Sequence, residues 1–173
     1  RTKVIWLGSN YPDRGEYNLE NDVSSVNYVI ESGIPLEIVT VRQNSSLRGS
    51  ANVSVSRTEI YDKMPGLGPL AMSPVTGRHG GSFRHFGDYS INLFQNKSGD
   101  RPRKPLFDLV ALSILKNPQW GVRESIPAPI VVDNLNWSNR PGNSREITIW
   151  EDFNSEAIIE DFFESIENDY LVE

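Results

Sequence analysis

Two apolar stretches decide the fold of this chain: residues 4–8 read VIWLG, and residues 36–41 read LEIVTV. Both are short and largely β-branched or aromatic, which is typical of buried strands. Between them, Asn21 or Asp22 is a candidate helix N-cap, and Ser32-Gly33 supplies a helix end. Strand, helix and strand within about forty residues predict a βαβ unit, whose two strands are parallel.

The same alternation continues along the chain. Ser56 followed by Glu59 is a capping-box pattern, which predicts a short helix to Met64. We expect a loop over residues 66–81, because glycine and proline recur there, and a helix over residues 82–95. Further expected elements are a helix over Leu106–Lys116, strands over Ile126–Val132 and Glu146–Trp150, and a helix over Glu156–Asn168. This order predicts one α/β domain over residues 1–173, with an open, mostly parallel sheet and helices on both faces.

The composition limits the classes of partner and of site that we expect. The 173 residues carry a formal net charge of −6, so we expect neither nucleic acid nor a membrane surface as a partner. The absence of cysteine excludes disulfides, thiolate metal sites and cysteine nucleophiles within this sequence. The compartment stays open, because exported proteins need no disulfides. The chain opens Arg1-Thr2-Lys3 without Met and runs straight into a strand, so we expect a cut or processed start.

The densest polar cluster follows the first strand. It consists of Asn10, Glu16, Asn18 and Asp22. Carboxylates accept hydrogen bonds from hydroxyls, and amides both donate and accept, so this set suits the vicinal hydroxyls of a sugar. A turn-rich surface loop with an Asp helix cap is the alternative interpretation, and composition alone leaves both open.

Three other side chains are candidates for chemistry. Asp108 begins a predicted helix, where it is either a metal ligand or a carboxylate favoured by the helix dipole. Calcium takes six to eight oxygens, so Asp108 does not make a calcium site by itself. His85 or Tyr89 is a candidate proton donor to a leaving group, and a solvated surface position is the alternative for both.

Three segments together resemble the nucleoside hydrolase family, of the inosine-uridine preferring type. They are IWLGSNYP at residues 5–12, GEYNLEND at 15–22 and SGIP at 32–35. The family pattern is a strand ending in glycines, a loop with an Asn, an Ala/Gly-Glu-Phe/Tyr-Asn motif and an Asn/Asp-capped helix. Asn10 precedes Glu16 by six residues, as in the family. The resemblance implies that Asn10, Glu16 and Asn18 bind the ribose hydroxyls.

A later segment, PLFDLVA at residues 105–111, resembles the family's Pro-x-His-Asp-x-x-Ala motif, whose Asp ligates calcium. The resemblance implies that Asp108 is a calcium ligand and that Phe107 contacts substrate. Phe107 stands where many members have a His that is proposed to assist the leaving base. The family's aspartate-rich motif, which supplies most calcium ligands and the general base, does not occur in the sequence. We therefore expect a C-terminal half, completed by a missing N-terminal half or by a partner chain.

The resemblance implies an enzyme when the fold is complete. The reaction is calcium-assisted hydrolysis of the N-glycosidic bond of nucleosides, as in purine and pyrimidine salvage, through an oxocarbenium-like transition state. We expect the chain alone to be inactive, the complete protein to be a homo-oligomer, and Glu16→Ala to lose turnover far more than stability. One alternative is a non-catalytic sugar-binding relative without the metal centre. Another is an interaction domain with an acidic surface.

Overall fold

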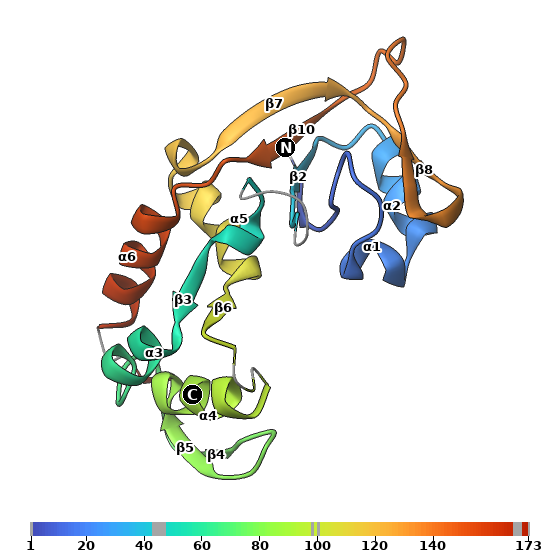
Figure 1. Ribbon diagram of the computed structural model, residues 1–173. Coiled ribbons are helices and arrows are strands. Elements are labelled where there is room, and N and C mark those ends of the chain that lie inside the picture. Colours follow the sequence, from blue (N-terminus) through green and yellow to red (C-terminus); the bar gives the residue numbers. More distant parts are fainter. Residues whose placement is uncertain (1, 43–47, 98, 100, 168–170, 173) are drawn as a thin grey trace. The chain divides into compact units, whose positions relative to one another are not determined.

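The computed structural model describes residues 2–42, 48–97, 99, 101–167 and 171–172 of the chain. It divides into two compact units (Figure 1). We call the first the sheet unit; it comprises the residues up to 53 and residues 106–155. The second, the hairpin unit, comprises residues 54–105 and the residues from 156 onward. Each unit is described by itself, and the expectation of one domain over residues 1–173 stays a prediction.

The sheet unit is built on a four-stranded sheet in the order β1-β2-β10-β7. Its strands are β1 (Val4–Leu7), β2 (Leu36–Val39), β10 (Glu146–Glu151) and β7 (Val122–Pro127). β1 and β10 both run parallel to β2, and β7 runs antiparallel to β10. The register aligns Trp6, Ile38 and Ile149 in one row across the three parallel strands. The prediction of an α/β fold with an open, mostly parallel sheet is confirmed.

Helices flank this sheet on two sides. The helices of the sheet unit are α1 (Tyr17–Asn21), α2 (Val23–Glu31), α5 (Phe107–Lys116) and the short 3-10 turns η1 (Ser50–Asn52), η2 (Pro118–Trp120) and η3 (Asp133–Leu135). α2 packs Ile30 against Leu36, Ile38, Ile147 and Ile149 of the sheet. In Figure 1, α2 lies to one side of β2 and α5 to the other. Burying this apolar row removes it from water, which is the main favourable contribution to folding.

The described residues of the hairpin unit form a β-hairpin, further short strands and three helices. Its elements are β3 (Ser54–Ser56), α3 (Arg57–Lys63), β4 (Leu70–Thr76), β5 (Ser82–His85), α4 (Phe86–Lys97), β6 (Arg103–Pro105), β11 (Leu171–Val172) and most of α6 (Ser155–Ile166). β4 and β5 pair as an antiparallel hairpin, and β3 pairs with β6. The capping box at the start of α3 forms as predicted: Ser56 Oγ accepts from Glu59 N, and Glu59 Oε2 accepts from Ser56 N.

The predicted loop over residues 66–81 and the predicted helix over residues 82–95 are wrong in part. Residues 70–76 form β4, and residues 82–85 form β5 before α4 begins at Phe86. Pro74 is tolerated in β4 because the ladder with β5 is irregular between Leu70 and Val75, so no pairing at Pro74 is interrupted. In residues 82–85 the side chains alternate between exposed and half-buried, which is the period of a strand.

Two other boundaries differ from the predictions. Residues 126–132 form two strands, because the chain leaves β7 at Ala128-Pro129 and then enters β8 (Ile130–Val132), which pairs with β9 (Asn136–Ser138). The last helix ends at Ile166, and its predicted end at Asn168 lies outside the described residues. No helix among the described residues is long and apolar enough to cross a membrane.

Asp22 is the N-cap of α2, which is one of the two interpretations that the sequence left open. Its carboxylate accepts hydrogen bonds from Ser25 N at 3.0 Å, from Ser25 Oγ at 2.5 Å and from Ser24 Oγ at 2.7 Å. These bonds, those of Ser25 first, lower the pKa of Asp22 from 3.8 to about 2. The carboxylate of Asp22 therefore caps α2 and is not available as a ligand for a sugar.

Acid should weaken this cap within a defined window. A carboxyl whose pKa is lowered by folding adds stability above its unfolded pKa and loses it as the pH falls through its folded pKa. For Asp22 the window runs from about pH 4 to about pH 2. We expect the urea midpoint of the wild type to fall more between these pH values than that of Asp22→Asn. Asp133→Asn, an exposed aspartate elsewhere, is the control; equal slopes for the wild type and Asp22→Asn would contradict the prediction.

Candidate functional site

The carboxyl ends of β1, β2 and β10 lie at the same end of the sheet, because these three strands are parallel. In open α/β sheets ligands bind at this end. β1 is followed by a loop, Gly8–Gly15, that leads into α1. Arg42 lies three residues after the end of β2, and β10 ends at Glu151. The candidate site of the sheet unit is this carboxyl end of the sheet.

The carboxylate of Glu16 connects the loop to α1 through hydrogen bonds. One oxygen of its carboxylate, Oε2, accepts three backbone hydrogen bonds, from Ser9 N and Asn18 N at 2.9 Å each and from Leu19 N at 3.2 Å. The first bond ties the start of the loop, and the other two cap the first turn of α1. Among the described residues no hydrogen bond to the second oxygen, Oε1, is formed. Glu16 thus has one oxygen fixed by the backbone and one acceptor left for a ligand.

Asn18 is held in a similar way. Its Nδ2 donates to the carbonyl of Leu7, the last residue of β1, at 3.0 Å. The side chain is exposed, and its Oδ1 is an acceptor on the same loop as Glu16. Asn10 lies on the loop, where its backbone N–H donates to Gly15 O and its carbonyl accepts from Asp13 N. The three residues therefore belong to one segment, with Asn10 on the loop, Glu16 at the N-cap of α1 and Asn18 in its first turn.

Ser9 is a positioning residue that sequence reasoning missed. It is fully buried and adopts a φ of 74°, a left-handed conformation that is unusual for a residue other than glycine. Its Oγ accepts from Tyr11 N at 2.8 Å, and its carbonyl accepts from Val41 N at 2.8 Å. The loop after β1 is thereby fastened to the end of β2. A serine directly after a strand-ending glycine was the signal available in the sequence.

A second feature missed from the sequence is an ion-pair network at the ends of β2 and β10. Arg42 pairs with the buried carboxylate of Glu151. Arg48 approaches the other oxygen of Glu151 at 3.1 Å and binds Asp152 through two nitrogens, at 3.0 and 2.9 Å. The hydrogen bond from Arg48 lowers the pKa of the Asp152 carboxyl. Each carboxylate here is neutralised by an arginine, so the network joins two strands and offers no open cation site.

Phe107 and Asp108 begin α5, in the sheet unit. Phe107 is half-buried, and Asp108 is exposed in the first turn, where the helix dipole favours a carboxylate. Neither residue is joined to the loop after β1 by a hydrogen bond or ion pair among the described residues. No group of three or more His, Asp or Glu side chains in the described part of the chain can hold a metal ion. These residues do not by themselves fit calcium, which requires more oxygen ligands than Asp108 supplies.

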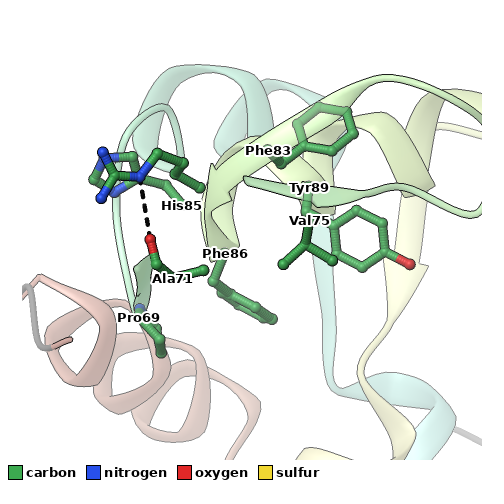
Figure 2. Close-up of a pocket in the computed structure, with 8 residues that line it drawn as sticks. Pro69, Ala71, Val75, Phe83, His85, Phe86 and Tyr89 are labelled. Carbon is green, nitrogen blue, oxygen red and sulfur yellow. Dashed lines mark hydrogen bonds between the residues drawn. The ribbon is translucent and has the colours of Figure 1, made fainter. Parts of the chain in front are cut away.

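His85 and Tyr89 lie in the hairpin unit, where both line one hollow of about 200 Å³ (Figure 2). Its wall also includes Phe83, whose ring centroid is 5.8 Å from that of Tyr89. The strand β5 supplies Phe83 and His85, and the first turn of α4 supplies Phe86 and Tyr89. The two predicted proton donors therefore share one apolar surface.

The three hydrogen bonds to Glu16 predict a stability cost that the sequence did not. Glu16→Ala leaves the N–H groups of Ser9, Asn18 and Leu19 without this partner, which should lower the free energy of unfolding by about 1–3 kcal/mol. Glu16→Gln keeps one oxygen for these donors and should cost less. Urea unfolding followed by circular dichroism measures both, and Glu20→Ala on exposed α1 is the control. A Glu16→Ala variant as stable as Glu20→Ala would show that the three bonds are not significant.

Comparisons with known proteins support a fold and no more. No protein-family model matches the sequence, and no curated protein matches it. Among solved structures, the inosine-uridine preferring nucleoside hydrolase from Bacillus anthracis matches with a TM-score of 0.58 at 12% sequence identity. The match covers 94% of this chain and 51% of that chain, so this chain spans about half the length of the solved one. The chain is thus similar in fold to a nucleoside hydrolase.

Proposed function

We propose that this chain is the ribose-binding part of an N-ribosyl hydrolase that acts on nucleosides. The observation that carries the proposal is the loop after β1, where the backbone holds Glu16 and Asn18 and leaves each an oxygen acceptor. Sugar hydroxyls are donors, so two adjacent hydroxyls suit this pair. The fold likeness to a nucleoside hydrolase supports the choice of substrate class.

The role of the loop in the reaction is to hold the sugar ring. Glu16 Oε1 and Asn18 Oδ1 accept from ribose hydroxyls, and Asn10 adds a third polar side chain on the same loop. Because the backbone bonds fix both acceptors beforehand, little ordering is required when the sugar binds. Binding energy is then available to favour the flattened, oxocarbenium-like ring of the transition state.

Two other residues of the sheet unit are assigned roles in this proposal. Phe107 contacts substrate through its aromatic ring. The role of His85 or Tyr89, in the hairpin unit, as a proton donor stays a prediction. Calcium would need ligands beyond the described side chains, of which Asp108 is the one that the resemblance assigns to it. No step of the reaction is derived through calcium, because the described side chains do not form a site for it.

A partner that completes the sheet is part of the proposal. β1 pairs only with β2 among the described strands, and it lies at the edge of the sheet. Val4 N and Gly8 N donate to carbonyls of the β2 side, so Ile5 turns its backbone groups to the open edge. The carbonyl of Leu7 on the same edge already accepts from Asn18 Nδ2. Beside β1 lies an apolar hollow of about 250 Å³, lined by side chains of β1, α2 and Leu36. These features suit a further strand, from the missing half of the fold or from another chain in an oligomer.

A non-catalytic sugar-binding protein is the second candidate. The observation that favours it is that no described group of side chains can hold a metal ion, while the loop after β1 keeps its acceptors. Both candidates predict ribose binding. Only the first predicts hydrolysis once the sheet is complete.

Ribose binding tests the loop assignment. We expect the 173-residue chain to bind D-ribose more tightly than 2-deoxy-D-ribose, which lacks one hydroxyl donor. Glu16→Gln should weaken ribose binding by about tenfold, because Gln keeps its oxygen on the backbone donors and turns an NH₂ group outward. Titration calorimetry measures both, with Glu20→Gln as the control. Equal binding of the two sugars, or an unchanged affinity in Glu16→Gln, would remove the assignment.

Native mass spectrometry tests the partner. We expect a species heavier than 19.5 kDa, containing a second copy or another chain. Ile5→Lys places a charge on the open edge of β1 and should release the 19.5 kDa chain, because charged side chains block edge pairing. Val122→Lys, on the opposite edge strand β7, is the control and should leave the assembly intact. Ribose release from inosine or uridine by the intact assembly then separates the hydrolase from the binding protein.

A further inference from the structure

A two-stranded ribbon of the sheet unit contacts both α2 and the loop after β1. We call it the β8–β9 ribbon; it comprises β8, β9 and the turn between them, residues 130–138. Figure 1 shows β8 next to α2. The turn of the ribbon reaches the end of the loop after β1, which leads into Glu16. The ribbon therefore joins α2 to the segment that precedes Glu16.

One side chain of α2, Asn27, fastens the ribbon to the helix. Its Nδ2 donates to the carbonyl of Val131 at 2.8 Å, and its Oδ1 accepts from Val131 N at 2.9 Å. Val131 is buried, and within the ribbon it lies opposite Trp137 of β9. The amide of Asn27 thus takes the place of a neighbouring strand, because it donates and accepts at once, as a backbone peptide does. Alanine at this position would form neither bond.

The ribbon in turn holds the loop after β1. The carbonyl of Leu135, in the turn of the ribbon, accepts from Gly15 N at 3.0 Å, and Gly15 directly precedes Glu16. Nearer the start of the loop, Tyr11 Oη donates to Asn139 Oδ1 at 2.9 Å, and Asn139 directly follows β9. The segment before Glu16 is thus held at two points, by the ribbon and by the residue after it.

The turn of the ribbon has a conformation that its own sequence does not favour. Asn134 and Leu135 adopt φ values of 57° and 62°, in the left-handed region. This region is unfavourable for leucine, so such a conformation persists where surrounding contacts fix it. The two bonds of Asn27 to the ribbon are contacts of this kind. Without them we expect the turn to relax and the carbonyl of Leu135 to leave Gly15.

We propose that Asn27 is a positioning residue for Glu16. Asn27 holds the β8–β9 ribbon, the ribbon holds Gly15, and Gly15 fixes the point at which the backbone enters Glu16. The carboxylate of Glu16 is then in place for its three backbone donors and for a ligand. The effect of Asn27 on ribose binding rests on the proposed function, whereas its effect on the conformation of the loop does not.

Amide hydrogen exchange, followed by nuclear magnetic resonance on the full 173-residue chain, tests the effect on the loop. In Asn27→Ala the Gly15 amide should exchange about tenfold faster than in the wild type, because its bond to Leu135 opens more often. Asn27→Gln restores an amide on a longer side chain and should recover part of the protection. An exchange rate of Gly15 that is the same in Asn27→Ala and in the wild type would overturn the proposal.

The matched control is Arg145→Gln, which also removes side-chain bonds to the α2 segment. Arg145 Nε donates to Ile30 O, near the end of α2, at 2.8 Å, and its Nη2 donates to Ile34 O. Urea unfolding verifies that both variants are folded and compares their stability. Arg145→Gln should leave the exchange of the Gly15 amide unchanged. Equally faster exchange in both variants would overturn the proposal, because the effect would then be a general loss of stability.

Titration calorimetry with D-ribose separates this proposal from the proposed function. We expect Asn27→Ala to weaken ribose binding by about tenfold and Arg145→Gln to leave it unchanged. A wild type and an Asn27→Ala variant that bind ribose equally well would overturn the role of Asn27 and leave ribose binding by the loop intact. A wild type that does not bind ribose would overturn the proposed function instead, and the exchange of the Gly15 amide then decides on Asn27.

Discussion

One carboxylate oxygen organises the candidate site. Oε2 of Glu16 accepts from the N–H groups of Ser9, Asn18 and Leu19, and it thereby joins the end of β1 to the first turn of α1. A charged acceptor shared by three donors forms stronger bonds than a neutral one would. These bonds, together with those of Ser9, hold the course of the loop. The same side chain therefore serves folding through one oxygen and is available to a ligand through the other.

The sequence predicts features that depend on neighbouring residues better than those that depend on residues far apart in the chain. The βαβ unit and the α3 capping box depend on signals only a few residues apart, and the structure confirms both. The motif around Glu16 pointed to the loop after β1 through a family resemblance, and the binding role of that loop stays a prediction. The contacts of Ser9 with Val41, and of Arg42 with Glu151, join residues 32 and 109 positions apart. No local pattern reports such pairs, because they follow from the order of strands in the sheet.

The hairpin at residues 70–85 shows that local sequence signals can also predict the wrong element. Its glycines and prolines are local signals for a loop, and they led to the wrong assignment of β4. The strand forms nevertheless, because β5 supplies hydrogen bonds on both sides of the irregular stretch that contains Pro74. Glycines in the turn are needed for a packing reason, since the ring of Phe83 occupies the space where side chains at Gly77 and Gly81 would lie. A composition that looks like loop thus belongs to a hairpin with a fixed aromatic ring.

The composition of β1 bears on what the sheet lacks. Strands of parallel sheets are covered on both faces and carry continuous apolar runs, whereas edge strands are usually protected by lysine, proline or a bulge. β1 reads VIWL, with no charge, proline or bulge, yet all four residues are only half-buried. In β2, by contrast, three of four residues are buried. The apolar sequence of β1 is that of an interior strand, while its position is that of an edge strand. The proposed continuation of the sheet beyond β1 would account for both facts.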